Sequence, residues 1–298
     1  MSNFITKLSI AALLLPTMTA ATERDRIPDF SGQWARTSLA FEKPASGHGP
    51  IENLNKRPTG ASNLSLLKAD TDDPILKPEA VAILKRLNEY AVRNEAFPQP
   101  SNQCLPYPPP YSSSNNQEIE LLQQKDRVTI LTMFDHQFRH VRLNAAHPRN
   151  LKPSWYGDSI GHYEGNTLVV DTVGIKLGPF PMTDIMGTPF SPALHVVERF
   201  RLVDAATARA FADRSERENG PVRGENGDGV EINADVQDKG LQLEIRVEDP
   251  GMLNAMWSGT VTYRRPIDPW AESVCAENTH EYYAGKETAI PVAKTPDF

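Results

Sequence analysis

From about residue 117 onward, hydrophobic and polar side chains alternate in short runs that end at turn residues. In the run 240–248, Leu241, Leu243, Ile245 and Val247 share one face, and polar side chains alternate with them. This period-two alternation is typical of antiparallel strands that bury one face. The predicted strands are 118–124, 127–134, 137–144, 158–163, 167–173, 193–203, 207–217, 229–237, 240–248 and 257–265.

Short connections such as 238–240 join these predicted strands and suit hairpins. Strands in consecutive hairpins predict a mainly β fold, either a lipocalin-like antiparallel barrel or a sandwich. We favour the barrel because closure removes exposed edge strands. The motif Gly32-Gln33-Trp34 is similar to the opening of lipocalin-type barrels, where the Trp plugs one end, but one buried Trp in a strand explains it equally.

The chain before residue 117 has a different pattern. Residues 42–76 are irregular and 97–117 are proline-rich, which favours an extended segment. Between them, Pro78 suits a first-turn position, and Val81, Leu84, Leu87 and Val92 recur at helical spacing. We therefore predict that residues 22–116 form an arm with an N-terminal strand and one α-helix. This arm packs on a β domain of residues 117–298, and 22–298 form one structural unit.

Residues 1–21 have the pattern of a secretory signal peptide. Lys7 precedes an apolar run, Leu8 to Leu15, and small residues follow before a cleavage point after Ala20 or Ala21. The apolar run is too short to span a bilayer, and no later run approaches that length. The sequence therefore predicts an exported protein, periplasmic or secreted, without a membrane span.

Charge and cysteine content narrow the choice of partners. The 298 residues carry a formal net charge of -7 and contain no basic cluster, which argues against a nucleic-acid partner. The two cysteines, Cys104 and Cys275, are expected to form a disulfide in an oxidising compartment. The alternative is two buried free thiols. The sequence leaves the oligomeric state open.

The stretch Gly157 to Gly161 reads GDSIG and fits the G-x-S-x-G pattern of serine hydrolases. That motif requires a strand before the serine and a helix after it. Here two prolines precede the serine, and a strand, a turn at Gly165-Asn166 and a second strand follow. We therefore predict a β-hairpin rather than a nucleophile elbow at Ser159.

This hairpin sorts its side chains onto two faces. Ser159 and Tyr163 lie on one face, and Asp158, His162, Glu164 and Asp171 lie on the other. Neighbouring strands are close enough for His162 to meet Asp171. Such a pair can serve acid–base chemistry, although a solvated sheet face has the same pattern.

The stretch HP…PSWYGDSIGHYEGNTLVVDT is similar to a pattern found in an uncharacterised family of exported bacterial proteins. The family's other segments are also visible: DFSGQW near the start, CLP at Cys104, HVVERF at His195, VEDP at Val247, and a C-terminal Cys. Tyr163 and Asn166 depart from the family's Trp and Asp. The resemblance implies export and a single domain, and it identifies no catalytic residue in this chain.

Glu198 lies amid large apolar side chains of one predicted strand, with Val196, Phe200 and Leu202 on the same face. A buried carboxylate must be paired or have a raised pKa, and such groups gather at functional sites. A structural ion pair with Arg142 or Arg246 is the alternative to a functional role.

The sequence offers no cofactor or metal site. His136 and His140 are four apart, but on one strand they would lie roughly 13 Å from each other. The segment 223–229 suits a hairpin loop better than a Ca²⁺ site. No Gly-rich loop follows an apolar strand, so a nucleotide cofactor is unsupported.

The leading hypothesis is capture of a small, partly apolar molecule in the mouth or lumen of the barrel. A hydrolase, lyase or isomerase using His and carboxylates is one alternative, and a structural or assembly role in the cell envelope is another. Glu248 and Asp249 end a strand, which suits either a ligand or a turn. The catalytic candidates are His162, Asp171 and Glu198. The ligand-binding candidates are Trp155, Asp158, Tyr163, His195, Glu248, Asp249 and Trp257.

Overall fold

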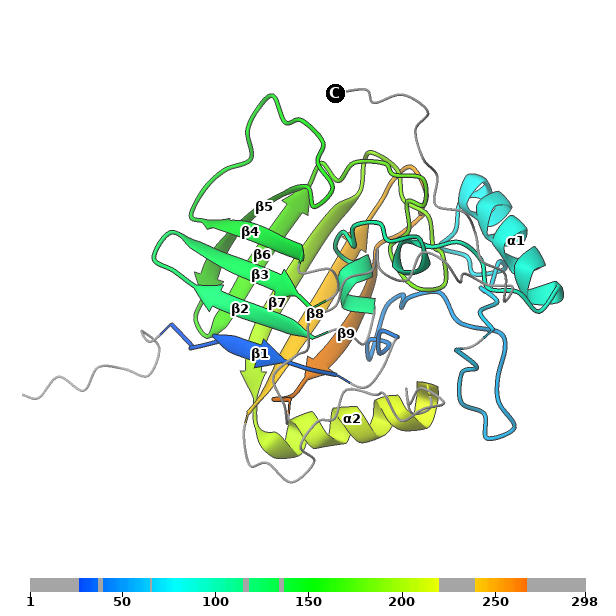
Figure 1. The fold of residues 1–298 in the computed structure, drawn as a ribbon, viewed down its shortest axis with the longest axis horizontal. Helices are drawn as coiled ribbons and strands as arrows, with labels where there is room; N and C mark the ends of the chain where they lie inside the picture. The colour runs from blue at the N-terminus through cyan, green and yellow to red at the C-terminus, as the bar shows by residue number, and fades with distance from the viewer. Residues whose placement is uncertain are drawn as a thin grey trace, which may run out of the picture.

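The computed structural model describes residues 27–36, 40–64, 66–114, 118–133, 137–219 and 239–266. Nine strands follow one another in chain order in one mixed sheet, which curls into a nearly closed barrel (Figure 1). The mainly β prediction is confirmed. The strands are β1 (Gly32–Trp34), β2 (Ile119–Gln123), β3 (Arg127–Thr132), β4 (Gln137–Leu143), β5 (Asp158–Glu164), β6 (Thr167–Val173), β7 (His195–Val203), β8 (Gly240–Glu248) and β9 (Trp257–Tyr263).

The first and last strands meet just beyond their ends. Ala35 and Arg264 each donate a backbone N–H to the carbonyl of the other, both at 2.7 Å, in an antiparallel bridge. The chain after β1 then continues along β9, where Glu42 pairs with Thr260. The barrel rather than the sandwich is therefore confirmed, and N-terminal residues cover the edge that β9 would otherwise expose.

The prediction of a wholly antiparallel sheet is wrong for one strand pair. β4 and β5 are parallel, with Val141 opposite Ser159 and Leu143 opposite Gly161. Parallel neighbours need a long crossover connection, and residues 144–157 provide it as the loop at the top of Figure 1. The seven other strand pairs in the sheet are antiparallel.

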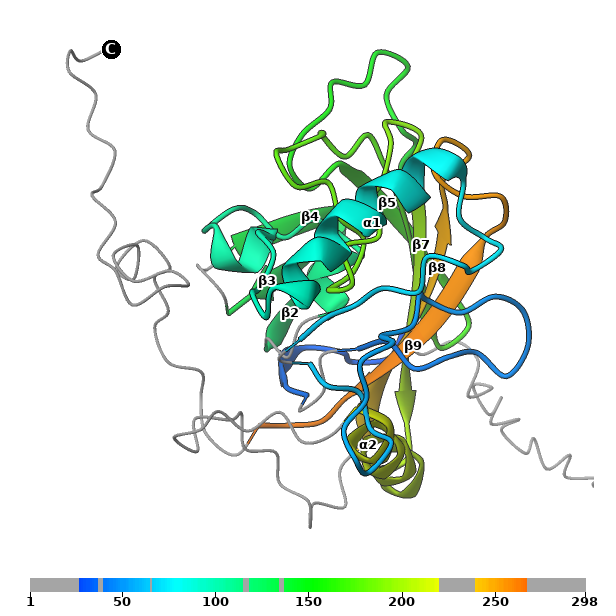
Figure 2. The same cartoon turned by 90° about the vertical axis from the view of Figure 1, so that its right-hand side faces the viewer.

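The predicted arm helix is α1 (Pro78–Val92), with Pro78 in its first turn. Figure 2 shows α1 outside the barrel, beside the segments that connect β1 to β2. Leu84 is fully buried and Val81 and Leu87 pack against the same core, as predicted, but Val92 at the last turn is exposed. Two short 3₁₀ helices follow in the proline-rich segment, Pro100–Asn102 and Tyr111–Ser114.

The predicted strand 207–217 is wrong, because this segment lies within a second helix, α2 (Ala205–Asn219). Asp204 caps its start: Oδ1 accepts the Thr207 N–H at 2.8 Å and Oδ2 accepts the Thr207 hydroxyl at 2.8 Å. Ala, Arg and Glu in this segment favour a helix. α2 packs against β8, where a Cβ on Gly240 would lie 2.5 Å from the Ala208 Cβ.

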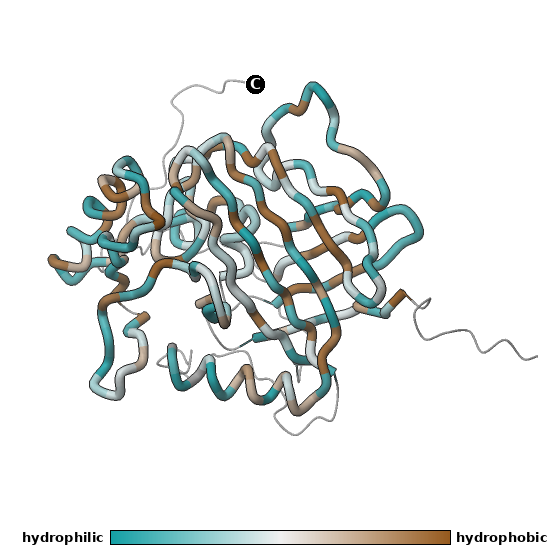
Figure 3. The backbone as a smooth tube through the Cα atoms, turned by 180° about the vertical axis from the view of Figure 1, so that it is seen from behind, coloured by the Kyte–Doolittle hydropathy of each residue, from teal (hydrophilic) through white to brown (hydrophobic). Residues whose placement is uncertain are grey.

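Alternating side chains fill the interior of the barrel. Figure 3 shows hydrophobic positions alternating with polar ones along the strands. On β8 the predicted inward face is confirmed, since Leu241, Leu243, Ile245 and Val247 are all buried. Trp34 is also buried, with the guanidinium of Arg265 stacked 3.7 Å from its ring centre.

Several predictions fall on residues outside the described ranges, and these stay predictions. They concern the signal peptide in 1–21, His136, the loop 223–229, the strand 229–237 and Cys275, and with Cys275 the disulfide to Cys104. Among the described residues, no helix has both the length and the apolar character to cross a membrane.

Candidate functional site

The β5–β6 hairpin has the predicted register. Glu164 lies opposite Thr167, and Ile160 lies opposite Asp171. Ser159 faces the interior, is almost fully buried, and its Oγ lies 2.9 Å from the Thr172 hydroxyl. The G-x-S-x-G match is thus part of a strand, and the serine is paired with a threonine rather than with an imidazole.

The interior of the barrel contains a buried ion pair, which we call the lumen pair. Arg139 on β4 donates to both carboxylate oxygens of Glu198 on β7, at 2.6 Å and 2.9 Å. Glu198 is buried as predicted, but its partner is Arg139 and not Arg142 or Arg246. Arg142 and Arg246 alternate outward on their strands, so their side chains cannot reach the interior.

The space beside the lumen pair is too small for a ligand. The cavity at this mouth has a volume of about 20 Å³ and is capped by Tyr107, Ser112 and Ser113 of the proline-rich segment. A cavity of this size holds about one water molecule. The arm and the inward side chains occupy this mouth, and capture of a ligand in the mouth or lumen of the barrel stays a prediction.

A second group of polar side chains, the outer-face cluster, consists of His147, Asp158, Asp171 and His195. His147 comes from the crossover loop, and the other three come from β5, β6 and β7. The Nδ1 atom of His147 lies 2.6 Å from Asp158 Oδ2, and the Nε2 atom of His147 lies 3.0 Å from Asp171 Oδ1. His195 Nε2 lies 3.1 Å from the other oxygen of Asp171.

The contacts of His147 favour its protonated form. Neutral imidazole has one donor nitrogen and one acceptor nitrogen, whereas ionised carboxylates only accept. Both nitrogens of His147 face carboxylates, so the imidazolium is the form that donates to both. Burial opposes this charge, but the hydrogen bonds to Asp158 and Asp171 outweigh it and raise the pKa of His147. Through these two hydrogen bonds His147 links the crossover loop to the sheet.

The predicted pairing of His162 with Asp171 is wrong. His162 does share the outer face, but its Nε2 lies 3.0 Å from Glu164 Oε1 on its own strand. Glu164 also accepts from Arg199 at 2.7 Å, and the two hydrogen bonds, that from Arg199 first, lower the pKa of this exposed carboxylate. Asp171 instead contacts His147. The sequence alone could not predict this contact, because the position of His147 depends on the crossover loop between β4 and β5.

The three aromatic candidates outside these groups have structural contacts. Trp155 lies against Lys176, with the ammonium 5.0 Å from the ring centre. Tyr163 accepts from the Gln123 side chain at 2.9 Å. Trp257 is fully buried against Phe41, their ring centres 5.4 Å apart.

The remaining two candidates lie at the end of β8. Asp249 is buried, and its carboxylate accepts from Ser191 and Gly251, which is the turn role that sequence also allowed. Glu248 is exposed, and its Oε2 lies 3.8 Å from His195 Nδ1, so it adjoins the outer-face cluster.

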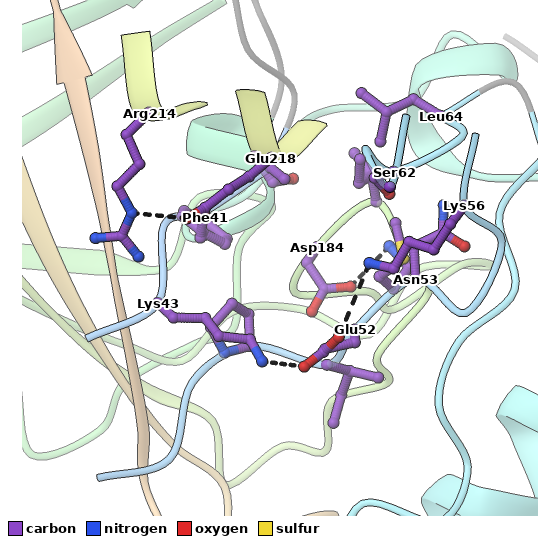
Figure 4. A pocket seen from close by; sticks show the side chains of 17 residues that line it. Phe41, Lys43, Glu52, Asn53, Lys56, Ser62, Leu64, Asp184, Arg214 and Glu218 are labelled. Carbon is purple, nitrogen blue, oxygen red and sulfur yellow. Dashed lines mark hydrogen bonds and ion pairs between the residues drawn. The ribbon is translucent and has the colours of Figure 1, made fainter. Parts of the chain in front are cut away.

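An opening much larger than the one beside the lumen pair lies at the side of the barrel. This side cavity has a volume of about 310 Å³ and is shown in Figure 4. The irregular segment 40–64, the loop at 184–186 and α2 form its walls. Apolar lining comes from Phe41, Pro50, Ile51, Leu64, Ile185 and Met186, and charged lining comes from Lys43, Glu52, Lys56, Asp184, Arg214 and Glu218.

The charged side chains at the edge of the side cavity pair with one another. Lys43 donates to Glu52, and Lys56 Nζ lies 3.8 Å from the other oxygen of Glu52. Arg214 donates to Glu218 at 2.8 Å, one turn away on α2. These pairs are visible around the opening in Figure 4.

Asp184 differs from these paired groups. Its side chain is 3% exposed, and Oδ1 accepts the backbone N–H groups of Met186 at 2.9 Å and Thr188 at 3.2 Å. Among the described residues, Oδ2 has no hydrogen-bond partner. Burial raises the pKa of this carboxyl group. The side chains of Thr188 and Thr183 act in the opposite direction on this pKa, and less than 1 Å² of Oδ2 is exposed, so this oxygen is packed within the protein.

A second buried carboxyl group, Glu42, is the chain neighbour of two lining residues, Phe41 and Lys43. It is 4% exposed, and Oε2 has no hydrogen-bond partner among the described residues. Burial raises its pKa to about 7, although the nearby guanidinium groups of Arg36 and Arg214 act in the opposite direction.

No family model, curated protein or solved structure matches this chain. The resemblance to a family of exported proteins therefore stays a prediction. The side cavity was missed from the sequence, and one signal could have found it: Asp184 is an acidic residue within the run PMTDIMGTPF, just as Glu198 is within HVVERF.

Proposed function

We propose that this protein is an exported, barrel-based binding protein that captures a small, partly apolar molecule in the side cavity. The observation that carries the proposal is the cavity itself, about 310 Å³ of space lined by both apolar and charged side chains. Small-molecule sites of roughly 300–1,000 Å³ combine apolar lining with a few polar groups in this way. The export part rests on the pattern of residues 1–21.

The position of the cavity suits a preformed site. Its walls come from segments far apart in the chain. A backbone hydrogen bond from Ser62 to the Glu218 carbonyl, at 2.8 Å, joins two of them, and one from Thr183 to the Thr188 carbonyl, at 2.8 Å, closes the loop that contains Asp184. A preformed site loses little conformational entropy when a ligand binds.

A thermal-shift screen of one-ring and two-ring aromatic compounds tests the proposal, with a cavity-filling variant as the discriminating reagent. Leu64 lines the cavity, so Leu64→Trp places an indole there. Leu54 is exposed on the same segment and does not line the cavity, so Leu54→Trp is the matched control. Compounds that bind the native state raise the midpoint of unfolding.

We expect at least one compound to stabilise the wild type and Leu54→Trp but not Leu64→Trp. Equal stabilisation of both variants would place binding elsewhere and overturn the proposal. A screen in which no compound stabilises the wild type would also overturn it.

A further inference from the structure

The charged side chains around the side cavity do not balance. On one side of the opening two ammonium groups share one carboxylate: Lys43 donates to Glu52, and Lys56 Nζ lies 3.8 Å from the other oxygen of Glu52. On the opposite side Arg214 and Glu218 pair one to one (Figure 4). These five side chains together carry one positive charge in excess.

Asp184 also belongs to the lining, but it offsets this excess little. Burial raises the pKa of its carboxyl group, which favours the uncharged form, and less than 1 Å² of Oδ2 is exposed. A ligand in the cavity therefore meets the excess positive charge on the side of Lys43 and Lys56.

Lys56 is the lining cation with hydrogen-bond donors to spare. Its distance of 3.8 Å from Glu52 exceeds that of a hydrogen bond, and within the described part of the chain its ammonium group donates none. By contrast, Lys43 and Arg214 each donate to a carboxylate. An ammonium group has three N–H donors, so Lys56 can bind an acceptor without breaking an existing hydrogen bond.

Ser62 places a hydroxyl group beside this ammonium group. Lys56 and Ser62 lie opposite each other in an antiparallel bridge, so their side chains point to the same side, as Figure 4 shows. The Ser62 Oγ has no hydrogen-bond partner among the described residues. It is nevertheless not one of the fully buried oxygens without a partner, so it is open to the cavity that Ser62 lines.

We infer that the side cavity binds a small carboxylate with an apolar body, whose oxygens accept from Lys56 Nζ and Ser62 Oγ. The bound carboxylate balances the excess charge, and such charge-assisted hydrogen bonds are stronger than neutral ones. The apolar body lies against Phe41, Ile51 and Ile185, which share the cavity. This inference rests on the proposed function and names the ligand class for the same site.

Three probes with a similar apolar body and different head groups test the inference: phenylpropionate, phenylpropanol and phenylpropylamine. At about pH 7 the first is an anion, the second is neutral and the third is a cation. Binding is measured by NMR titration of the backbone amides of Ser62 and Met186, two residues that line the cavity. We expect phenylpropionate to bind about tenfold more tightly than the alcohol, and the amine to bind most weakly.

Two lysine variants locate the charge that the carboxylate meets. Lys56→Gln removes it and should bring the affinities of the carboxylate and the alcohol within about twofold of each other. Lys85→Gln is the matched control, because Lys85 is exposed on α1 and does not line the cavity. It changes the net charge of the protein equally and should leave the preference as in the wild type. Ser62→Ala should weaken binding of the carboxylate about threefold.

Other outcomes would overturn the inference. Equal binding of carboxylate and alcohol, or a preference that survives Lys56→Gln, would leave the proposed apolar site intact but refute the carboxylate site. Tightest binding of the amine would show a site for cations. If no probe shifts these amides while the earlier screen still yields Leu64-dependent compounds, only the inference fails; if both experiments are negative, both proposals fail.

Discussion

The barrel lumen and the side cavity each bury a carboxyl group, and the two groups are satisfied in opposite ways. Glu198 has both oxygens paired with Arg139, in a space that holds about one water molecule. Asp184 has one oxygen without a partner among the described residues, beside about 310 Å³ of open space. Burial of a carboxylate therefore does not by itself mark a functional site. The open volume beside Asp184, and not the burial of its carboxyl group, is what suits a ligand.

The largest effect is expected from breaking the lumen pair. Glu198→Ala leaves the Arg139 guanidinium buried without its partner, and this should lower the free energy of unfolding by about 3–5 kcal/mol. Denaturant unfolding measures the loss. A double variant, Arg139→Met with Glu198→Leu, removes both charges and should recover most of the stability. A loss below about 1 kcal/mol for Glu198→Ala would contradict a structural role for the pair.

The next effect concerns Glu42, the incompletely paired carboxyl group next to the side cavity. Its pKa in the folded protein, about 7, lies above the ordinary 4.5, so its stabilising contribution is present below 4.5 and lost as the pH rises through 7. Glu42→Gln should therefore raise the free energy of unfolding at pH 8 by up to about 3 kcal/mol and change it little at about pH 4.

Glu79→Gln, an exposed substitution on α1, is the control for Glu42 and should show no such pH dependence. Identical stability profiles for wild type and Glu42→Gln between these pH values would mean that Glu42 is solvated. Glu42 would then no longer be a buried carboxyl group to compare with the fully paired Glu198.

A smaller effect is expected in the outer-face cluster. The raised pKa of His147 means that its contribution is fully present below the ordinary value of 6.5 and is lost as the pH rises through the folded value. Relative to His147→Gln, the wild type should lose about 1 kcal/mol between about pH 6 and about pH 9. Hydrogen exchange in residues 144–157 should increase over the same range. His162→Gln, on the same face, is the control, and a wild-type profile parallel to that of His147→Gln would refute the bridge.

The smallest effect is expected at Ser159. Ser159→Ala removes one neutral hydrogen bond to Thr172 inside the barrel, which is worth about 1 kcal/mol or less. Ligand binding in the side cavity should be unchanged, since Ser159 does not line it. Covalent labelling of Ser159 by a fluorophosphonate would contradict the buried position and restore the serine-hydrolase interpretation.

The features that sequence predicted well depend on local regularities. Alternation placed the hairpin register of β5 and β6, and with it the inward face of Ser159 and the outward face of His162. The same rule placed Glu198 in the interior, and helical spacing together with Pro78 placed α1. Alternation predicts a strand at 207–217, but the side-chain cap from Asp204 to Thr207 favours the helix that forms there.

Only the tertiary structure decided which side chains meet. Arg139 pairs with Glu198 because β4 and β7 face each other across the barrel, 59 positions apart in the chain. His147 reaches Asp171 because a crossover makes β5 parallel to β4. The side cavity needs segment 40–64, the loop at 184–186 and α2 to converge. Alternation along a strand depends on neighbouring residues and is written into the sequence, whereas contacts across a barrel depend on closure and connection geometry, which a one-dimensional pattern does not contain.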